Sequence, residues 1–113
     1  MSITNKTDII PSGTLCKIGA RGLSISSDGY MMITELESSI RLYEKINLST
    51  FPSFNDFKGE TTDVFEGDIA LIISFVGRPK KVKNDPEWFQ YDVYKVLVNG
   101  SKREIFRQNL LLV

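Results

Sequence analysis

The chain has 113 residues, of which 42% are hydrophobic and 25% charged, and its 14 basic and 14 acidic side chains give a formal net charge of zero. This composition is typical of a globular domain and indicates neither a disordered tail nor a strongly basic nucleic-acid-binding protein. The sequence has no histidine and one cysteine, Cys16, which excludes histidine-based catalysis, histidine metal ligation and an intrachain disulfide.

The N-terminal part of the chain, residues 1–46, is predicted to form short strands. A Pro-Ser-Gly turn precedes a strand expected over residues 14–18. Asp28-Gly29 favours the tight turn of a hairpin whose strands lie over residues 23–25 and 30–34. This part is therefore expected either to extend or to duplicate the domain that follows.

Residues 36–46 leave two interpretations open, because their apolar positions fit a helical stripe in part and alternate imperfectly. We predict a strand, since the neighbouring segments are strands. Residues 47–63 are predicted to be a linker, because they are rich in Pro, Ser, Asn, Gly and Thr. Phe51, Phe54 and Phe57 recur in it at every third position. We expect them to anchor the linker to the core, the alternative being an aromatic strip for a partner.

The C-terminal part, residues 64–113, is predicted to form a small barrel. A fully apolar strand is expected over residues 69–74, and a long polar loop follows it. Asn99-Gly100 then separates two runs rich in β-branched and aromatic residues, which is the strongest short-range signal of a hairpin. A polar step leads to a closing apolar run over residues 110–113.

The predicted hairpin has apolar side chains on both faces. A two-residue turn sets Lys95 opposite Glu104, where we expect an exposed cross-strand charge pair. By alternation, one face carries Tyr94, Val96, Val98 and Ile105, and the other carries Tyr91, Val93, Leu97 and Phe106. Because a hairpin with one solvated side needs one apolar face, a further layer must cover the second. Either the preceding residues or a second copy of the chain could supply that layer. The candidate interface residues are accordingly Phe51, Phe54, Phe57, Val93, Leu97 and Phe106.

Three motifs indicate the kind of barrel. They are GDIAL over residues 67–71, YKVLVNG over residues 94–100, and Asn109-Leu110. With them, residues 65–113 resemble the small SH3-like barrels that occur in many copies in tailed-phage genomes and have relatives among ribosome- and transcription-associated modules. The resemblance implies an all-β fold, with an SH3-like small barrel and an N-terminal β extension or second, degenerate barrel half. The function of that phage group is mostly unknown, so the resemblance implies an architecture rather than an activity.

The basic cluster of the loop is the candidate binding site of the sequence. It consists of Arg78, Lys80, Lys81 and Lys83, and the aromatic residues Trp88 and Tyr91 follow it. Backbone charge contacts beside stacking platforms are the elements of single-stranded nucleic-acid binding. The simpler interpretation, which we favour, is a solvated loop with Trp88 as a core or interface anchor. A shelf for an extended peptide is the other role open to Trp88.

The sequence predicts a non-enzymatic interaction module that binds a protein partner or associates with itself as a homo-oligomer. The alternative is a nucleic-acid-binding accessory module that uses the basic loop. We identify no catalytic residue, metal ligand, cofactor or small-molecule substrate. No signal-peptide pattern and no apolar run of membrane-spanning length occurs, and a lone thiol suits a reducing compartment. We therefore expect no membrane partner and a cytoplasmic location, in the host cytoplasm or the virion if a phage encodes the chain.

Overall fold

The computed structural model describes residues 8–25, 31–36, 39–51, 54–82 and 88–112. Within these ranges the chain forms nine strands and four short 3-10 helices, and no α-helix. The strands are β1 (Leu15–Ile18), β2 (Arg21–Ile25), β3 (Met31–Leu36), β4 (Ser39–Ile46), β5 (Phe57–Phe65), β6 (Ile69–Gly77), β7 (Val93–Val98), β8 (Ser101–Phe106) and β9 (Leu110–Leu112). The 3-10 helices are η1 (Phe54–Asp56), η2 (Lys80–Val82), η3 (Trp88–Tyr91) and η4 (Arg107–Asn109).

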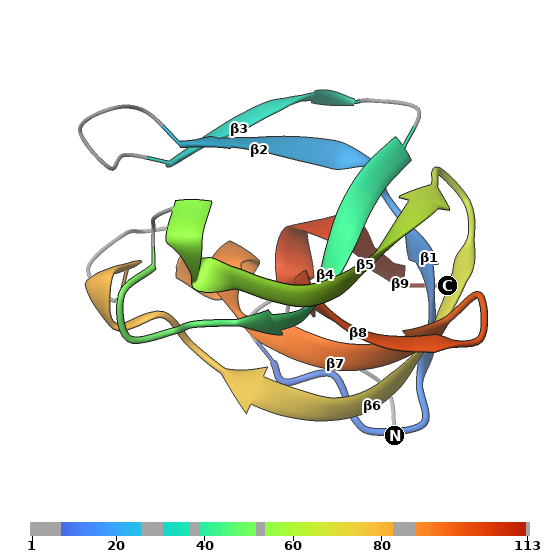
Figure 1. Ribbon diagram of the computed structural model, residues 1–113. Helices are drawn as coiled ribbons and strands as arrows, with labels where there is room; N and C mark the ends of the chain where they lie inside the picture. The colour runs from blue at the N-terminus through green and yellow to red at the C-terminus, as the bar shows by residue number, and fades with distance from the viewer. Residues whose placement is uncertain (1–7, 26–30, 37–38, 52–53, 83–87, 113) are drawn as a thin grey trace.

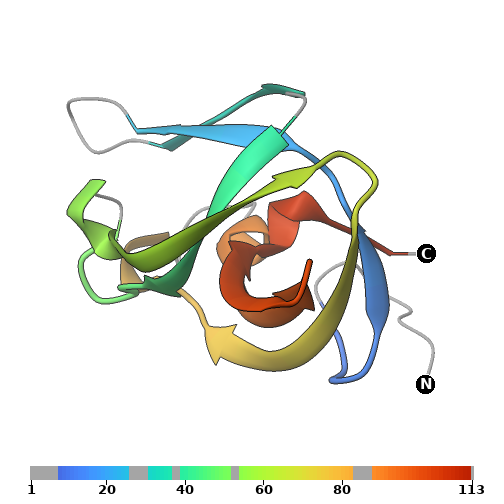
Figure 2. The same ribbon diagram turned by 45° about the vertical axis from the view of Figure 1, so that its right-hand side comes forward.

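Seven of the described strands form one antiparallel sheet in the order β5-β4-β8-β7-β6-β1-β9. The sheet curls around its own inner face, so that the strands enclose the interior as a half-barrel (Figures 1 and 2). The hairpin of β2 and β3 forms a separate two-stranded sheet at one side of it. The prediction of an all-β small barrel with an N-terminal β extension is confirmed.

Two bulges bend β6 and help the sheet to curl. The pairing of β6 with β7 shifts register between Ile72 and Ser74 and again between Phe75 and Gly77. A bulge adds one residue to one strand of a pair and increases the local bend and twist. The longest apolar run of the chain therefore serves as the curved middle of the sheet rather than as a flat strand.

The concave face of the sheet holds the main hydrophobic core. Its buried members come from the N-terminal segment and from all seven strands of the large sheet. They are Ile10, Cys16, Ile18, Leu42, Val64, Ala70, Ile72, Tyr94, Val96, Val98, Ile105 and Leu110. The four residues predicted for the first face of the hairpin are thus all in this core.

The hairpin of β7 and β8 has the register that the sequence predicts. Val98 pairs with Ser101, Lys95 with Glu104 and so on to the strand ends. Asn99 and Gly100 both have positive φ, of 50° and 79°, as a two-residue turn matched to the strand twist requires. Local turn chemistry and alternation therefore determine this element.

The predicted charge pair within the hairpin takes a different form. Lys95 and Glu104 lie opposite each other, but β4 covers Glu104, which is buried. One oxygen of the Glu104 carboxylate accepts a hydrogen bond of 2.7 Å from the backbone N–H of Ile46. The Glu104 carboxylate thus connects β8 to β4. The sequence predicted an exposed pair, but β4 covers this side of the hairpin.

The segment expected to be a linker contains a strand. Residues 57–63 belong to β5, which pairs with β4 along most of its length. β1 in turn pairs with both β6 and β9. The N-terminal and C-terminal parts therefore share one sheet, and the strand predicted for residues 36–46 is found over residues 39–46.

The remaining predicted elements are found where they are described. The strand expected over residues 14–18 is β1, and the expected N-terminal hairpin is formed by β2 and β3. Its predicted turn at Asp28-Gly29 lies outside the described residues. The closing apolar run forms β9, and the polar step before it is η4.

Candidate functional site

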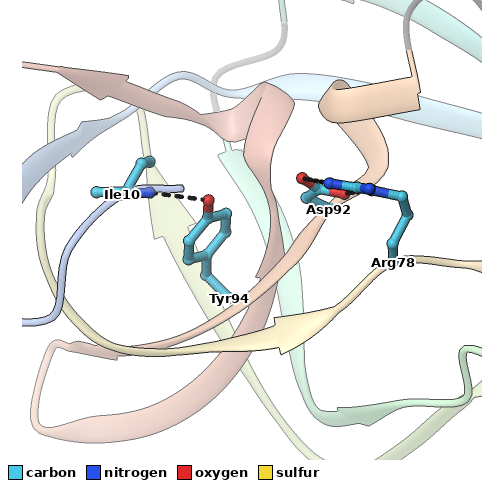
Figure 3. Close-up of polar contacts among 4 residues, drawn as sticks. All are labelled: Ile10, Arg78, Asp92 and Tyr94. Carbon is cyan, nitrogen blue, oxygen red and sulfur yellow. Dashed lines mark hydrogen bonds and ion pairs between the residues drawn. The ribbon is translucent and has the colours of Figure 1, made fainter. Parts of the chain in front are cut away.

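Arg78 is the first basic residue of the predicted binding loop, and it is held by two partners within the chain. Its Nε donates to Oδ1 of Asp92 at 2.7 Å, and its Nη2 donates to Oδ2 at 3.2 Å, as Figure 3 shows. Its guanidinium carbon also lies 3.8 Å from the centre of the Trp88 ring. Arg78 thus fixes the end of β6 to η3 through one bidentate ion pair and one cation–π contact.

The two side chains of the Arg78–Asp92 ion pair differ in burial. The Asp92 side chain is 4% exposed, whereas that of Arg78 is 38% exposed. The hydrogen bond to Asp92 raises the pKa of Arg78. The backbone carbonyl of Asp92 also accepts the N–H of Arg107 at 2.8 Å, which connects the loop to η4. These contacts assign Arg78 to the framework of the loop.

The other residues of the predicted binding loop have different surroundings. Lys80 and Lys81 are exposed, and Lys83 lies outside the described residues. Tyr91 is buried in a second hydrophobic cluster. The described part of the loop therefore presents two lysines and a Trp88 ring that already contacts Arg78, and the nucleic-acid hypothesis stays a prediction.

The second hydrophobic cluster covers most of the second face of the hairpin. It joins β4, the segment after it, η3, β7 and β8. Its buried members are Ile46, Phe51, Tyr91, Val93 and Phe106, with Leu48 and Phe57 packed against them. The Phe51 ring lies 5.0 Å from the Phe106 ring. The chain itself thus supplies the predicted covering layer over this part of the hairpin.

The candidate interface residues therefore separate into two groups. Phe51, Val93 and Phe106 are interior residues, and Phe57 packs partly buried against them. Phe54 begins η1. Leu97 remains on the surface, with 38% of its side chain exposed. Among the members of this set whose side chains the structure describes, Leu97 is the exposed one.

Leu97 belongs to an apolar surface that crosses four strands. In β-sheet pairing Leu15 of β1 lies opposite Leu71 of β6, and Leu71 lies opposite Leu97 of β7. In the neighbouring row, Lys17 of β1 lies between Ile69 of β6 and Leu111 of β9. We call this surface the aliphatic face, defined by Leu15, Ile69, Leu71, Leu97 and Leu111.

The aliphatic face is open to solvent, and lysines accompany it on its strands and on β8. Leu15 is 55% exposed, and Ile69 and Leu111 are about equally open, whereas Leu71 at the centre is half-buried. The lysines on the same side of the sheet are Lys17, Lys95 and Lys102. β1, β6, β7 and β9 contain no acidic residue, and the carboxylate of β8, Glu104, is buried. The surface therefore combines aliphatic area with positive charge.

Sequence reasoning identified one of these five residues and missed the other four. Leu15 and Lys17 alternate with two buried residues in β1, and this pattern could have indicated an outward side for Leu15. Ile69 and Leu71 belong to a run that is apolar at every position, so alternation cannot separate their inner and outer faces. Their exposure is decided by the pairing of β1 with β6, which joins residues far apart in sequence.

The described residues contain no group of three or more acidic or cysteine side chains placed to hold a metal ion. In the same part of the chain, no helix is long and apolar enough to span a membrane. The fold defines the class as an all-β small barrel. No family model, no curated protein and no solved structure matches this chain.

Proposed function

We propose that the chain is a non-enzymatic protein-interaction module that docks a partner on the aliphatic face. The observation that carries the proposal is the exposure of four aliphatic side chains around the half-buried Leu71 on adjacent strands, while the other cross-strand apolar residues of the hairpin are buried within the chain. Contiguous exposed apolar surface is typical of interaction sites, whereas single exposed residues are ordinary. The absence of histidine from the sequence supports a binding role rather than a catalytic one.

The occupant that fits this surface is an acidic, apolar segment of another protein. Lys17, Lys95 and Lys102 accompany the aliphatic side chains, and no exposed carboxylate accompanies them on these strands. Two copies that met through the same face would bring their lysines together, which like-charge repulsion disfavours. A partner with Leu or Ile between Asp or Glu residues would bury the aliphatic area and pair with the lysines.

A peptide titration tests this proposal. The probe is an amphipathic peptide of alternating Leu and Glu, followed by amide chemical shifts of the labelled protein and by calorimetry. We expect saturable binding that weakens with added salt, with the largest shifts in β1, β6 and β7. A peptide with Lys in place of Glu should bind at least tenfold more weakly.

Two matched variants locate the binding surface. Leu97→Gln should weaken peptide binding several-fold, because it removes apolar area from the aliphatic face. Val76→Gln is the control. Val76 has the same exposed fraction as Leu97, 38%, but it lies in the second bulge of β6 and is not part of the aliphatic face. Equal losses in both variants would contradict the proposal. So would binding of a mixed single-stranded oligonucleotide, in place of the acidic peptide, at the same strands.

A further inference from the structure

A shallow cavity of about 210 Å³ lies where η3, η4, β9 and the start of β2 meet. It is distinct from the aliphatic face in most of its lining, sharing Leu111 alone. Its walls combine two arginines, two glutamines and three apolar side chains. They are Arg21, Phe89, Gln90, Arg107, Gln108, Leu110 and Leu111.

Neither arginine of the cavity forms an ion pair within the described part of the chain. The ion pairs found there join Arg41 to Asp63, Arg78 to Asp92 and Arg103 to Glu60. Arg21 and Arg107 are in none of them. Arg107 uses Nη1 to donate to the carbonyl oxygen of Leu110 at 2.8 Å, and its buried Nε has no hydrogen-bond acceptor. Donors of the guanidinium are therefore left for a further acceptor.

Gln108 provides an independent indication of a ligand. Its side chain is among the most buried polar groups of the chain, with an exposed fraction of 8%. Neither its Oε1 nor its Nε2 has a hydrogen-bond partner. Buried amides in native proteins are nearly always paired, and an unpaired one requires an explanation. A bound acceptor at Nε2 would supply part of that explanation.

We propose that this cavity binds a small carboxylate that carries a short apolar chain. The guanidinium groups of Arg21 and Arg107 match the planar geometry of a carboxylate, and Arg107 has donors available for it. Phe89 and Leu110 provide an apolar wall for the chain of the ligand. The cavity is smaller than those that take drug-sized molecules, so the ligand has few heavy atoms.

Hexanoate is the probe that tests this inference, with hexanol as its neutral counterpart and acetate as its short counterpart. We expect saturable millimolar binding of hexanoate, followed by amide shifts that centre on η3, η4 and β9. Hexanol and acetate should each bind at least fivefold more weakly. If hexanol binds as tightly as hexanoate, the claim that the cavity recognises the carboxylate charge is overturned. If acetate binds as tightly, the claim that the apolar wall contributes to affinity is overturned. Shifts that do not saturate would overturn the binding site itself.

Variants of the exposed Arg21 avoid the risk of unfolding that accompanies changes at Arg107. Arg21→Gln should weaken hexanoate binding at least fivefold, and Arg21→Lys should restore part of the loss. Arg41→Gln, at an exposed arginine elsewhere, should leave binding unchanged. Gln108→Leu should keep the fold and lower affinity at least threefold, because it removes the buried amide. Unchanged affinity in both Arg21→Gln and Gln108→Leu would overturn the proposal.

Discussion

Arg78 illustrates how one side chain can serve the framework although its position in the sequence indicates a binding loop. A cation next to Lys80 and Lys81 in the sequence is ordinarily expected in solvent. Its bidentate contact with Asp92 depends on the buried position of that carboxylate, which follows η3. Sequence patterns do not show such a contact, because it depends on how the loop folds back on the sheet.

Arg78→Gln should lower the free energy of unfolding by about 2 kcal/mol, because it leaves the buried Asp92 carboxylate without its cation. This value is lower than for a fully buried pair, since Arg78 is partly exposed to solvent. Arg41→Gln is the matched control. It breaks an ion pair whose two side chains are both more than half exposed and screened by solvent, so we expect a much smaller loss. Urea unfolding of the three proteins measures both values, and equal losses would contradict the assigned role of Arg78.

Tyr94 gives the fold a dependence on alkaline pH. Its hydroxyl oxygen accepts the backbone N–H of Ile10 at 3.1 Å and so holds the N-terminal segment against the core (Figure 3). Burial raises the pKa of Tyr94 above its ordinary value of 10.0, with the hydrogen bond from Ile10 as the largest opposing cause. The folded chain therefore holds this proton more tightly than the unfolded chain does.

The stabilisation from Tyr94 is consequently complete below pH 10.0 and is lost as the pH rises through the raised pKa. Tyr94→Phe should cost about 1 kcal/mol at neutral pH, because the Ile10 N–H loses its acceptor. It should also make the alkaline fall in stability shallower. Denaturant unfolding at neutral pH and above pH 10 measures this difference, and parallel curves for the two proteins would contradict it.

Within the strands and turns, Gly59 and Gly100 both have positive φ, but an added side chain would overlap with a neighbouring residue only at Gly59. Gly100 closes the β7–β8 hairpin with φ of +79°, and a Cβ there would meet nothing within 4 Å. Gly59 has φ of +89°, and a Cβ there would lie 2.7 Å from the Cβ of Glu44. The register of β4 with β5 shifts at this point, between Tyr43 and Lys45, so Gly59 forms part of a bulge.

Gly100→Ala should therefore destabilise the chain by about 1 kcal/mol, the cost of a positive φ for alanine. Gly59→Ala should cost more, about 2–3 kcal/mol, because overlap with Glu44 adds to the strain. Thermal or urea unfolding of both variants checks the order. A larger loss for Gly100→Ala would contradict the bulge at Gly59.

The elements also show which sequence signals are sufficient. The β7–β8 hairpin was predictable to the residue, because Asn99-Gly100 fixes the turn and the turn fixes the register. β5 was not predictable, because it is an edge strand of mostly exposed, polar residues without apolar alternation. The aliphatic face was predicted only at Leu97, although alternation in β1 also indicates an outward Leu15. Ile69, Leu71 and Leu111 acquire their outward positions from the pairing of β1 with β6 and β9.

At the scale of the whole molecule, Cys16 reports on the integrity of the core. Its side chain is fully buried, and burial raises the pKa of its thiol. We expect iodoacetamide to label Cys16 slowly at pH 8, at a rate set by opening of the fold rather than by the reagent. Arg78→Gln should label faster, by the factor by which its lost stability increases the equilibrium population of the open form. Rapid labelling of the unaltered protein would contradict the enclosure of β1 between β6 and β9.

The arrangement of charge on the whole chain leads to a definite expectation for its association. Phe51 and Phe106, two of the aromatic residues predicted for an interface, are interior, and the aliphatic face carries lysines on the same side of the sheet. We therefore expect this surface to disfavour association with a second copy at low ionic strength, when charges are least screened. We propose that it binds an acidic, apolar segment under the same conditions.

Docking on the aliphatic face is tested most directly by the solution mass from light scattering at low salt, with and without the Leu-Glu peptide fused to a carrier protein. We expect a monomer alone and a one-to-one complex with the fusion, which Leu97→Gln weakens and Val76→Gln does not. A dimer at low salt that Leu97→Gln converts to a monomer would contradict it, because the aliphatic face would then bind a second copy of the chain.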